Sequence, residues 1–256
     1  MASRIKLAGL AAAIMLAVSC ESYVQTTSGA DYLARYDETH LSADRATHSD
    51  IDADIRDIAA IEPTLDFPAR IGLARIEHGR LSAIPADEGY IWQDTLADLG
   101  PLYGEFVPVS PLIAASVAKY PERGMASTPA TTTIANIRRG AARQHLDFVL
   151  VYEVGSSSAE KANALAFADL TVIGMFVLPS RSIDVEASAS GLMIDVRTGY
   201  PYATLTAHSE KSGVSRAVSE YSSRRALADT AEERAVEKLA EEFNSVMEEL
   251  ARASLK

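Results

Sequence analysis

LDFVLVYEV, residues 146–154, is the strongest strand signal in the sequence, and its apolar composition predicts a buried β-strand. It follows directly on residues 131–145, in which Ile134, Ile137 and Ala141 recur at helical spacing. A helix that leads straight into an apolar strand is typical of helices layered on a sheet. We therefore expect a fold of the α/β or α+β class.

The residues after this strand predict an antiparallel meander. Two stretches, 165–178 and 183–196, are rich in strand-forming residues, and a turn at 197–199 leads into a further strand at 200–208. The turn reads Arg-Thr-Gly, and its glycine can adopt the positive φ that a tight turn needs. Residues 155–161 are expected to form a hairpin loop.

The residues before it predict further helices and strands. A first core strand is expected at 69–76, and a helical pattern begins at Pro85 and ends at the Gly-Pro pair 100–101. A second short strand is expected at 106–109. The Ser-Pro pair 110–111 then has the residue types of a helix N-cap and first turn.

The C-terminal residues predict a long amphipathic helix. Thr230 and Glu233 have the spacing of a capping box, and apolar residues recur after them at three- and four-residue steps. Taken together, the pattern predicts one domain over residues 63–256. We expect a three-layer-like α/β (α+β) domain with a mixed β-sheet, an antiparallel meander in the second half and a C-terminal helix.

The N-terminal residues 1–19 have the architecture of a signal peptide. Arg4 and Lys6 precede an apolar run at residues 7–18 that is shorter than the roughly 20 residues a transmembrane helix needs. The residues Leu-Ala-Val-Ser before Cys20 resemble the lipobox of bacterial lipoproteins, in which the cysteine is acylated and becomes the first mature residue. This resemblance implies that Cys20 is the lipid attachment site and carries acyl chains such as palmitate. The alternatives are a plain secretory signal and a cytoplasmic N-terminal helix.

Residues 20–62 are expected to be a polar tether that contains one short helix. The helix is expected after Ser49, because Ile51, Ile55 and Ile58 recur at helical spacing. In the lipoprotein pattern an aspartate after the cysteine can signal retention at the inner membrane. The residue here is Glu21, so we expect the periplasmic face of the outer membrane.

Composition and charge exclude several classes of function. The chain has 256 residues, of which 48% are hydrophobic, so it can bury a core. Its formal net charge is -11, from 24 Lys plus Arg and 35 Asp plus Glu, and nucleic acid is therefore not an expected partner. A single cysteine excludes an intramolecular disulfide and a multi-cysteine metal site.

The sequence has no recognisable catalytic motif. It contains no G-x-S-x-G elbow and no standard phosphate-binding loop, and Gly-Ser-Ser-Ser at 155–158 lacks the second glycine of the elbow. None of the five histidines is paired at the spacing of a helical zinc motif. Trp92 is expected in the core, and Asp94, Asp98 and Glu105 are expected on a solvated face. We predict a protein that is not an enzyme, with no catalytic residue, cofactor or metal.

The order of these elements resembles the periplasmic domain of two lipoproteins, CsgG of curli secretion and the penicillin-binding-protein activator LpoB. The matching segments are 144–155, where a helix runs into a strand, and 195–199, which carries the pattern "dv-TG". LDFPARIGLARIE (65–77) and GLMIDVRTGYPYATL (191–205) look like the rhombotarget lipoprotein family, over roughly residues 60–210. That family is named for a glycine-rich C-terminal sorting tail. The present chain ends LARASLK, so processing by a rhomboid-type sorting protease is not implied.

These features predict a membrane-anchored lipoprotein of the bacterial cell envelope that acts as a non-enzymatic binding or scaffold module. Its expected partners are the membrane, through the N-terminal lipid, and either an envelope protein or further copies of itself. The alternatives are an oligomeric secretion or pore-associated lipoprotein of the CsgG type and an unrecognised envelope enzyme. In residues 183–191 charged side chains alternate with small ones rather than with large apolar ones, which favours the binding module.

Overall fold

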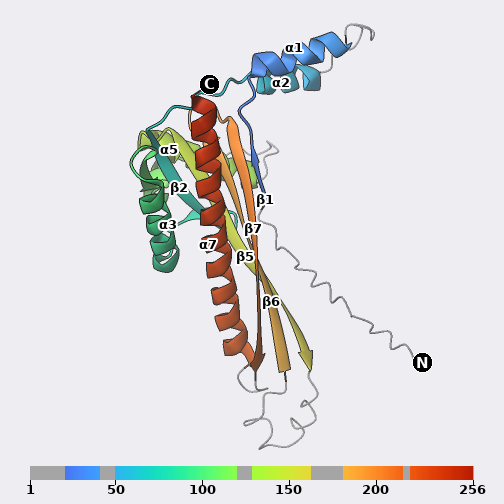
Figure 1. Ribbon diagram of the computed structural model, residues 1–256, viewed down its shortest axis with the longest axis vertical. Helices are drawn as coiled ribbons and strands as arrows, with labels where there is room; N and C mark the ends of the chain where they lie inside the picture. The colour runs from blue at the N-terminus through green and yellow to red at the C-terminus, as the bar shows by residue number, and fades with distance from the viewer. Residues whose placement is uncertain (1–20, 41–49, 120–128, 163–180, 216–219, 256) are drawn as a thin grey trace, which may run out of the picture.

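The computed structural model describes residues 21–40, 50–119, 129–162, 181–215 and 220–255 (Figure 1). In this part of the chain, seven strands form one mixed sheet. They are β1 (Glu21–Val24), β2 (Ala69–Glu77), β3 (Arg80–Ser82), β4 (Gly104–Pro108), β5 (Phe148–Ala162), β6 (Arg181–Asp195) and β7 (Pro201–Ser215). The helices are α1 (Gly29–His40), α2 (Asp50–Ala59), α3 (Ala86–Leu99), α4 (Pro111–Ser116), α5 (Pro129–Arg143) and α7 (Glu220–Ser254). The fold is α+β, and the expected fold class is confirmed.

The sheet has the strand order β1-β7-β6-β5-β2-β3, and β4 also pairs with β2. Strands β5, β6 and β7 are antiparallel neighbours; β6 and β7 confirm the predicted meander strands at 183–196 and 200–208, and β5 is the third member. Strand β2 pairs in parallel with both β4 and β5. Both the parallel and the antiparallel parts of the mixed sheet therefore meet at β5.

Helices cover both faces of the central sheet. Side chains of β5 alternate between the two sides, as the pleat requires. Phe148, Leu150 and Tyr152 lie in the larger apolar cluster with α3 and α7. Val149 and Val151 lie in the smaller cluster beneath α5. This alternation gives the predicted three layers around the strand that the sequence identified first.

The long strands extend beyond β2 as a three-stranded ribbon, made of residues 154–162, 181–189 and 207–215. Helix α7 runs along one face of this ribbon (Figure 1). The apolar residues of the ribbon in β6, such as Ile183 and Val185, are buried on the side of α7. Asp184 and Glu186 alternate with them and are exposed on the opposite face. Among the described residues, the ribbon is therefore two-layered, with a polar face opposite α7.

Helix ends at several predicted positions are confirmed. Pro85 precedes α3, and Gly100 follows its last residue with a φ of 76°. Ser110 is the N-cap of α4, because its hydroxyl accepts a hydrogen bond from the Ile113 amide at 3.4 Å. Pro111 occupies the first helical turn, where its missing N–H group costs nothing.

Two boundaries differ from the sequence prediction. Residues 155–161 are not a loop, because β5 continues to Ala162 and every residue keeps a partner in β6. Thr230 is not a helix cap, since α7 begins at Glu220 and the Thr230 hydroxyl donates to the Ala226 carbonyl at 2.9 Å. Packing of α7 on the ribbon explains the longer helix. The expected strand at 165–178 lies outside the described residues.

The N-terminal segment also differs from the polar tether expected over residues 20–62. Strand β1 pairs with β7 from Glu21↔Thr206 to Val24↔Ala203, so the sheet begins at residue 21. Helix α1 was not predicted, whereas the short helix expected after Ser49 is confirmed as α2. The edge of β7 supplies hydrogen-bond partners that a polar sequence alone does not reveal.

The turn between β6 and β7 is organised by a buried aspartate. Asp195 is 0% exposed, and its Oδ1 accepts hydrogen bonds from the amides of Arg197 and Thr198, both at 2.7 Å. Gly199 has a φ of 79°, which confirms the predicted turn glycine. Thr64 donates to the other carboxylate oxygen at 2.9 Å. The turn is therefore tied to the segment that precedes β2.

Candidate functional site

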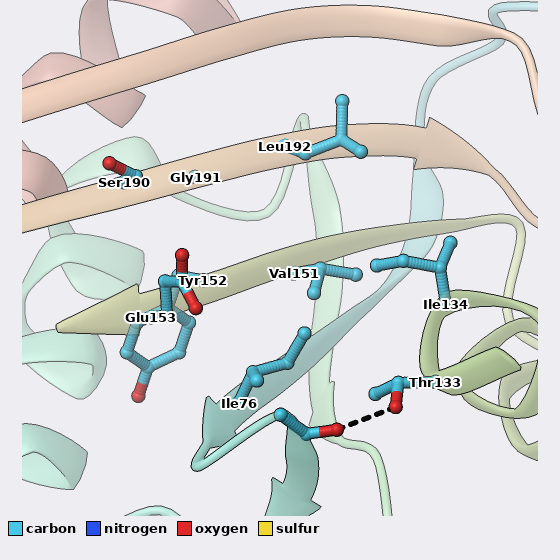
Figure 2. A pocket seen from close by; sticks show the side chains of 10 residues that line it. Ile76, Thr133, Ile134, Val151, Tyr152, Glu153, Ser190, Gly191 and Leu192 are labelled. Carbon is cyan, nitrogen blue, oxygen red and sulfur yellow. Dashed lines mark hydrogen bonds between the residues drawn. The ribbon is translucent and has the colours of Figure 1, made fainter. Parts of the chain in front are cut away.

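A pocket of about 270 Å³ opens on the face of the sheet opposite α7, beside the N-terminal half of α5 (Figure 2). Four elements and one turn form it. The lining residues are Ile76 of β2, Gly79 of the β2–β3 turn, Thr133 and Ile134 of α5, Val151, Tyr152 and Glu153 of β5, and Ser190, Gly191 and Leu192 of β6.

The pocket exists because the cover provided by α5 ends where the ribbon begins. Thr133 donates a hydrogen bond to the Gly79 carbonyl at 2.6 Å, and this bond ties α5 to the β2–β3 turn. Leu192 on β6 carries the apolar surface beyond α5. The sheet thus presents aliphatic surface that no helix in the described residues covers.

The walls of the pocket are aliphatic. Ile76, Ile134, Val151 and Leu192 surround the opening in Figure 2, and Val151 is 4% exposed. Glu153 is exposed and is the only carboxylate among the lining residues. Such a site can hold an apolar group with a cationic or hydrogen-bond donor group next to it.

A second arrangement of interest is a buried polar cluster on the other face of the sheet. Arg75 of β2 donates through Nε to both carboxylate oxygens of Glu88 of α3, at 2.9 and 3.0 Å. The Tyr152 hydroxyl donates to the same carboxylate at 2.8 Å. The side chains of Arg75 and Glu88 are each only 9% exposed. The cluster therefore links β2, α3 and β5 inside the core.

The electrostatics of this cluster favour a structural role. Burial raises the pKa of the Glu88 carboxyl, and the Tyr152 hydroxyl and the Arg75 charge oppose that effect. Burial, followed by the charge of Glu88, raises the pKa of Tyr152 well above its ordinary value. The phenol is therefore a permanent hydrogen-bond donor at neutral pH rather than a base.

The residues singled out in the sequence do not converge on one site. Cys20 lies outside the described residues. Trp92 is 1% exposed and packs between Tyr152 and Phe243, as expected of a core residue. The carboxylates chosen as solvated are exposed: Asp94 and Asp98 on α3, and Glu105, which pairs with Arg70.

Sequence reasoning missed both the pocket and the polar cluster. Arg75 stands in the strand ARIGLARIE, where a charged residue at a core position signals a buried partner. Nothing in the sequence pointed to Glu88 as that partner, because its helix also carries exposed acidic residues. The pocket depends on where the N-terminal end of α5 lies relative to β6, and these two segments are distant in the sequence.

Membrane-spanning helices and clustered metal ligands are both absent from the described part of the chain. None of its helices is both long and apolar enough to cross a membrane. Among the same residues, no group of three or more histidine, cysteine or acidic side chains is arranged to hold a metal ion.

Comparison with known proteins identifies no family. No family model matches the chain, and no curated protein matches it. Among solved structures, a PelC dodecamer variant from Paraburkholderia phytofirmans has a TM-score of 0.32 and 13% identity, covering 72% of this chain and 93% of its own. A second PelC dodecamer from the same organism has a TM-score of 0.32 and 11% identity, covering 70% and 86%. This likeness is too low to carry an argument about function.

Proposed function

We propose that the protein is a lipid-anchored periplasmic module of the bacterial cell envelope, held at the outer membrane through Cys20, which binds a partner protein without catalysing a reaction. The observation that carries the binding role is the aliphatic pocket between α5, β5 and β6. Its walls suit an apolar side chain of a partner, and Glu153 at the same site suits a neighbouring cationic group.

The anchoring role rests on the N-terminal sequence. A short apolar run after Arg4 and Lys6 and a small residue before Cys20 support lipoprotein processing. Several acyl chains on one cysteine give stable attachment, because each buried methylene contributes about 0.8 kcal/mol.

Metabolic labelling with a clickable palmitate tests the anchor. We expect label on the wild-type protein and none on Cys20→Ser. Equal labelling of both proteins would exclude acylation at this cysteine.

Photo-crosslinking in intact cells tests the pocket. A photoreactive amino acid at Leu192 is expected to give one discrete adduct, whereas the same amino acid at Leu112, which is 83% exposed on α4, serves as the control. An adduct with a different envelope protein supports the binding module. Ring-sized adducts of the chain with itself favour the oligomeric secretion alternative, and identical patterns at both positions would refute a specific pocket.

A further inference from the structure

An exposed apolar face lies close to the start of the described chain. It consists of Tyr23 on β1, Tyr32 on α1, and Ile55 and Ile58 on α2, and is called the tyrosine–isoleucine face below. These side chains are 64%, 50%, 53% and 69% exposed, respectively. All four line one hollow of about 520 Å³ between β1, α1 and α2. Large apolar side chains gathered in this way mark a contact surface.

The tyrosine–isoleucine face is held firmly on the sheet. After β1, the Gln25 amide donates to the Tyr202 carbonyl at 2.8 Å, and the Tyr200 hydroxyl donates to the Thr27 carbonyl at 2.8 Å. Helices α1 and α2 approach each other so closely at Gly29 that an added Cβ would lie 2.4 Å from the Ala59 carbonyl oxygen.

A carboxylate at the end of this segment also fixes α1. Glu62 accepts hydrogen bonds from the Ala30 amide at 2.8 Å and from the Ser28 hydroxyl at 3.1 Å. These contacts connect the start of α1 to the residues that follow α2. These contacts therefore connect the two helices and β1 to the sheet.

The proposed acylation site is next to this unit in the chain. Cys20 precedes Glu21, the first residue of β1, which is paired with Thr206 of β7. Three residues of extended chain span about 10 Å, so Tyr23 cannot lie farther than that from the Cys20 backbone. Acyl chains inserted in a bilayer therefore keep Tyr23 close to the membrane, and α1 and α2 follow β1 in the same part of the domain.

We propose that the tyrosine–isoleucine face docks on the bilayer surface beside the acyl chains and so fixes the orientation of the domain. This inference rests on the proposed function, because it requires acylation at Cys20. Tyrosine has an amphipathic ring that suits the interface between headgroups and hydrocarbon, and the isoleucines add apolar area.

The charges around the face specify the lipid. Asp31, Asp54 and Asp57 are exposed on the same two helices and outnumber the basic residues there, which are Arg35 at the hollow and Arg56. Negative charge at this position repels anionic headgroups, so the contact is apolar and favours a zwitterionic surface. A surface held by basic residues would behave in the opposite way.

Fluorescence quenching by brominated phosphatidylcholine tests the docking with the full-length, lipidated protein in vesicles. Trp92 is the only tryptophan and is 1% exposed, so tryptophans introduced by Tyr23→Trp or Ile58→Trp report as a difference from the parent. We expect quenching at least twofold stronger than for Leu112→Trp, an exposed control on α4. Quenching equal to the control, in protein that carries palmitate, would overturn the docking.

The remaining outcomes separate this inference from the proposed function. Absence of palmitate label together with loss of vesicle binding refutes the anchor and leaves the tyrosine–isoleucine face without a membrane. A dimer mass by light scattering, with both tryptophans shielded from brominated lipid, assigns the face to a second copy and overturns the docking. Vesicles enriched in phosphatidylglycerol are expected to weaken the quenching, and stronger quenching there would contradict the apolar contact.

Discussion

Replacing Glu88 by glutamine is expected to destabilise the domain by about 3 kcal/mol. The substitution keeps the size and an acceptor oxygen but removes the negative charge from the cluster with Arg75 and Tyr152. Arg75 then stays charged, with a side chain that is 9% exposed. Removing one partner of a buried ion pair costs about 3–5 kcal/mol, because the other charge is left unpaired.

The lower end of this range follows from a neighbouring carboxylate. Glu77 Oε2 lies 3.5 Å from Arg75 Nη1, but its side chain is 51% exposed, so solvent screens it and its compensation is partial. Tyr152→Phe removes one neutral donor to the carboxylate and is expected to cost about 1 kcal/mol. The double variant Arg75→Met with Glu88→Leu replaces both charges by apolar groups but leaves the buried Tyr152 hydroxyl without its acceptor, so it is expected to cost only about 1–2 kcal/mol.

Urea unfolding followed by tryptophan fluorescence measures these differences directly. Trp92 is a suitable probe because its ring centroid is 5.2 Å from that of Tyr152. A loss below about 1 kcal/mol for Glu88→Gln, with an unchanged denaturant slope, would refute the claim that an unpaired Arg75 charge is costly here. A double variant as unstable as the single variant would show that the cluster is needed for its shape rather than for charge balance.

Three further predictions concern two glycines, the buried carboxylate of Asp195 and the exposed carboxylate of Glu62. Gly104→Ala should destabilise the domain by more than about 3 kcal/mol, because φ is 111° and the new Cβ would lie 1.8 Å from the Ala69 carbonyl oxygen. The control Gly89→Ala within α3 should stabilise the domain by about 0.5–1 kcal/mol in the same urea assay. Equal stabilities of the two variants would contradict the close approach of β4 to β2. Asp195→Ala should cost about 3 kcal/mol by thermal or urea unfolding, because two turn amides at 2.7 Å lose a charged acceptor, and a change below about 1 kcal/mol would show that the turn forms without it. The pKa of Glu62 is lowered, first by the hydrogen bond from the Ala30 amide, so its stabilisation of α1 is present above the ordinary carboxyl pKa of 4.5 and is lost as pH falls through the folded value. Amide protection factors in α1, which correct for the intrinsic pH dependence of exchange, should therefore fall on acidification in the wild type but not in Glu62→Gln, and an identical pH profile for both would argue against this contact.

Local signals in the sequence identified the elements that carry the core. The apolar run at 146–154, the Pro85 start of α3 and the Ser-Pro pair before α4 are decided by residues within a few positions of one another, and the structure confirms them. The turn after Asp195 was recognised for the same reason. The turn requires a residue with positive φ, and a glycine at that position is recognisable from a short stretch of sequence.

Features that depend on distant segments were not predicted. Strand β1 looks like a polar linker because its stabilising partner, β7, lies far along the chain. The serines at 156–158 suggest a loop, yet pairing with β6 holds them in a strand. The capping box at Thr230 was wrong, since packing on the ribbon extends α7 by ten residues before it, from Glu220. In each case tertiary pairing overrides the local preference.

The length and position of α7 have a consequence for the order of folding. This helix has 35 residues, about 50 Å, and follows all seven described strands in the sequence. The apolar side of the ribbon is buried against it, so the ribbon lacks this cover until α7 is available. The sheet also receives its first strand, β1, only after β7 exists. The ribbon therefore folds only after α7 has been synthesised, and a chain that stops before α7 leaves three long strands with an uncovered apolar face and a tendency to aggregate.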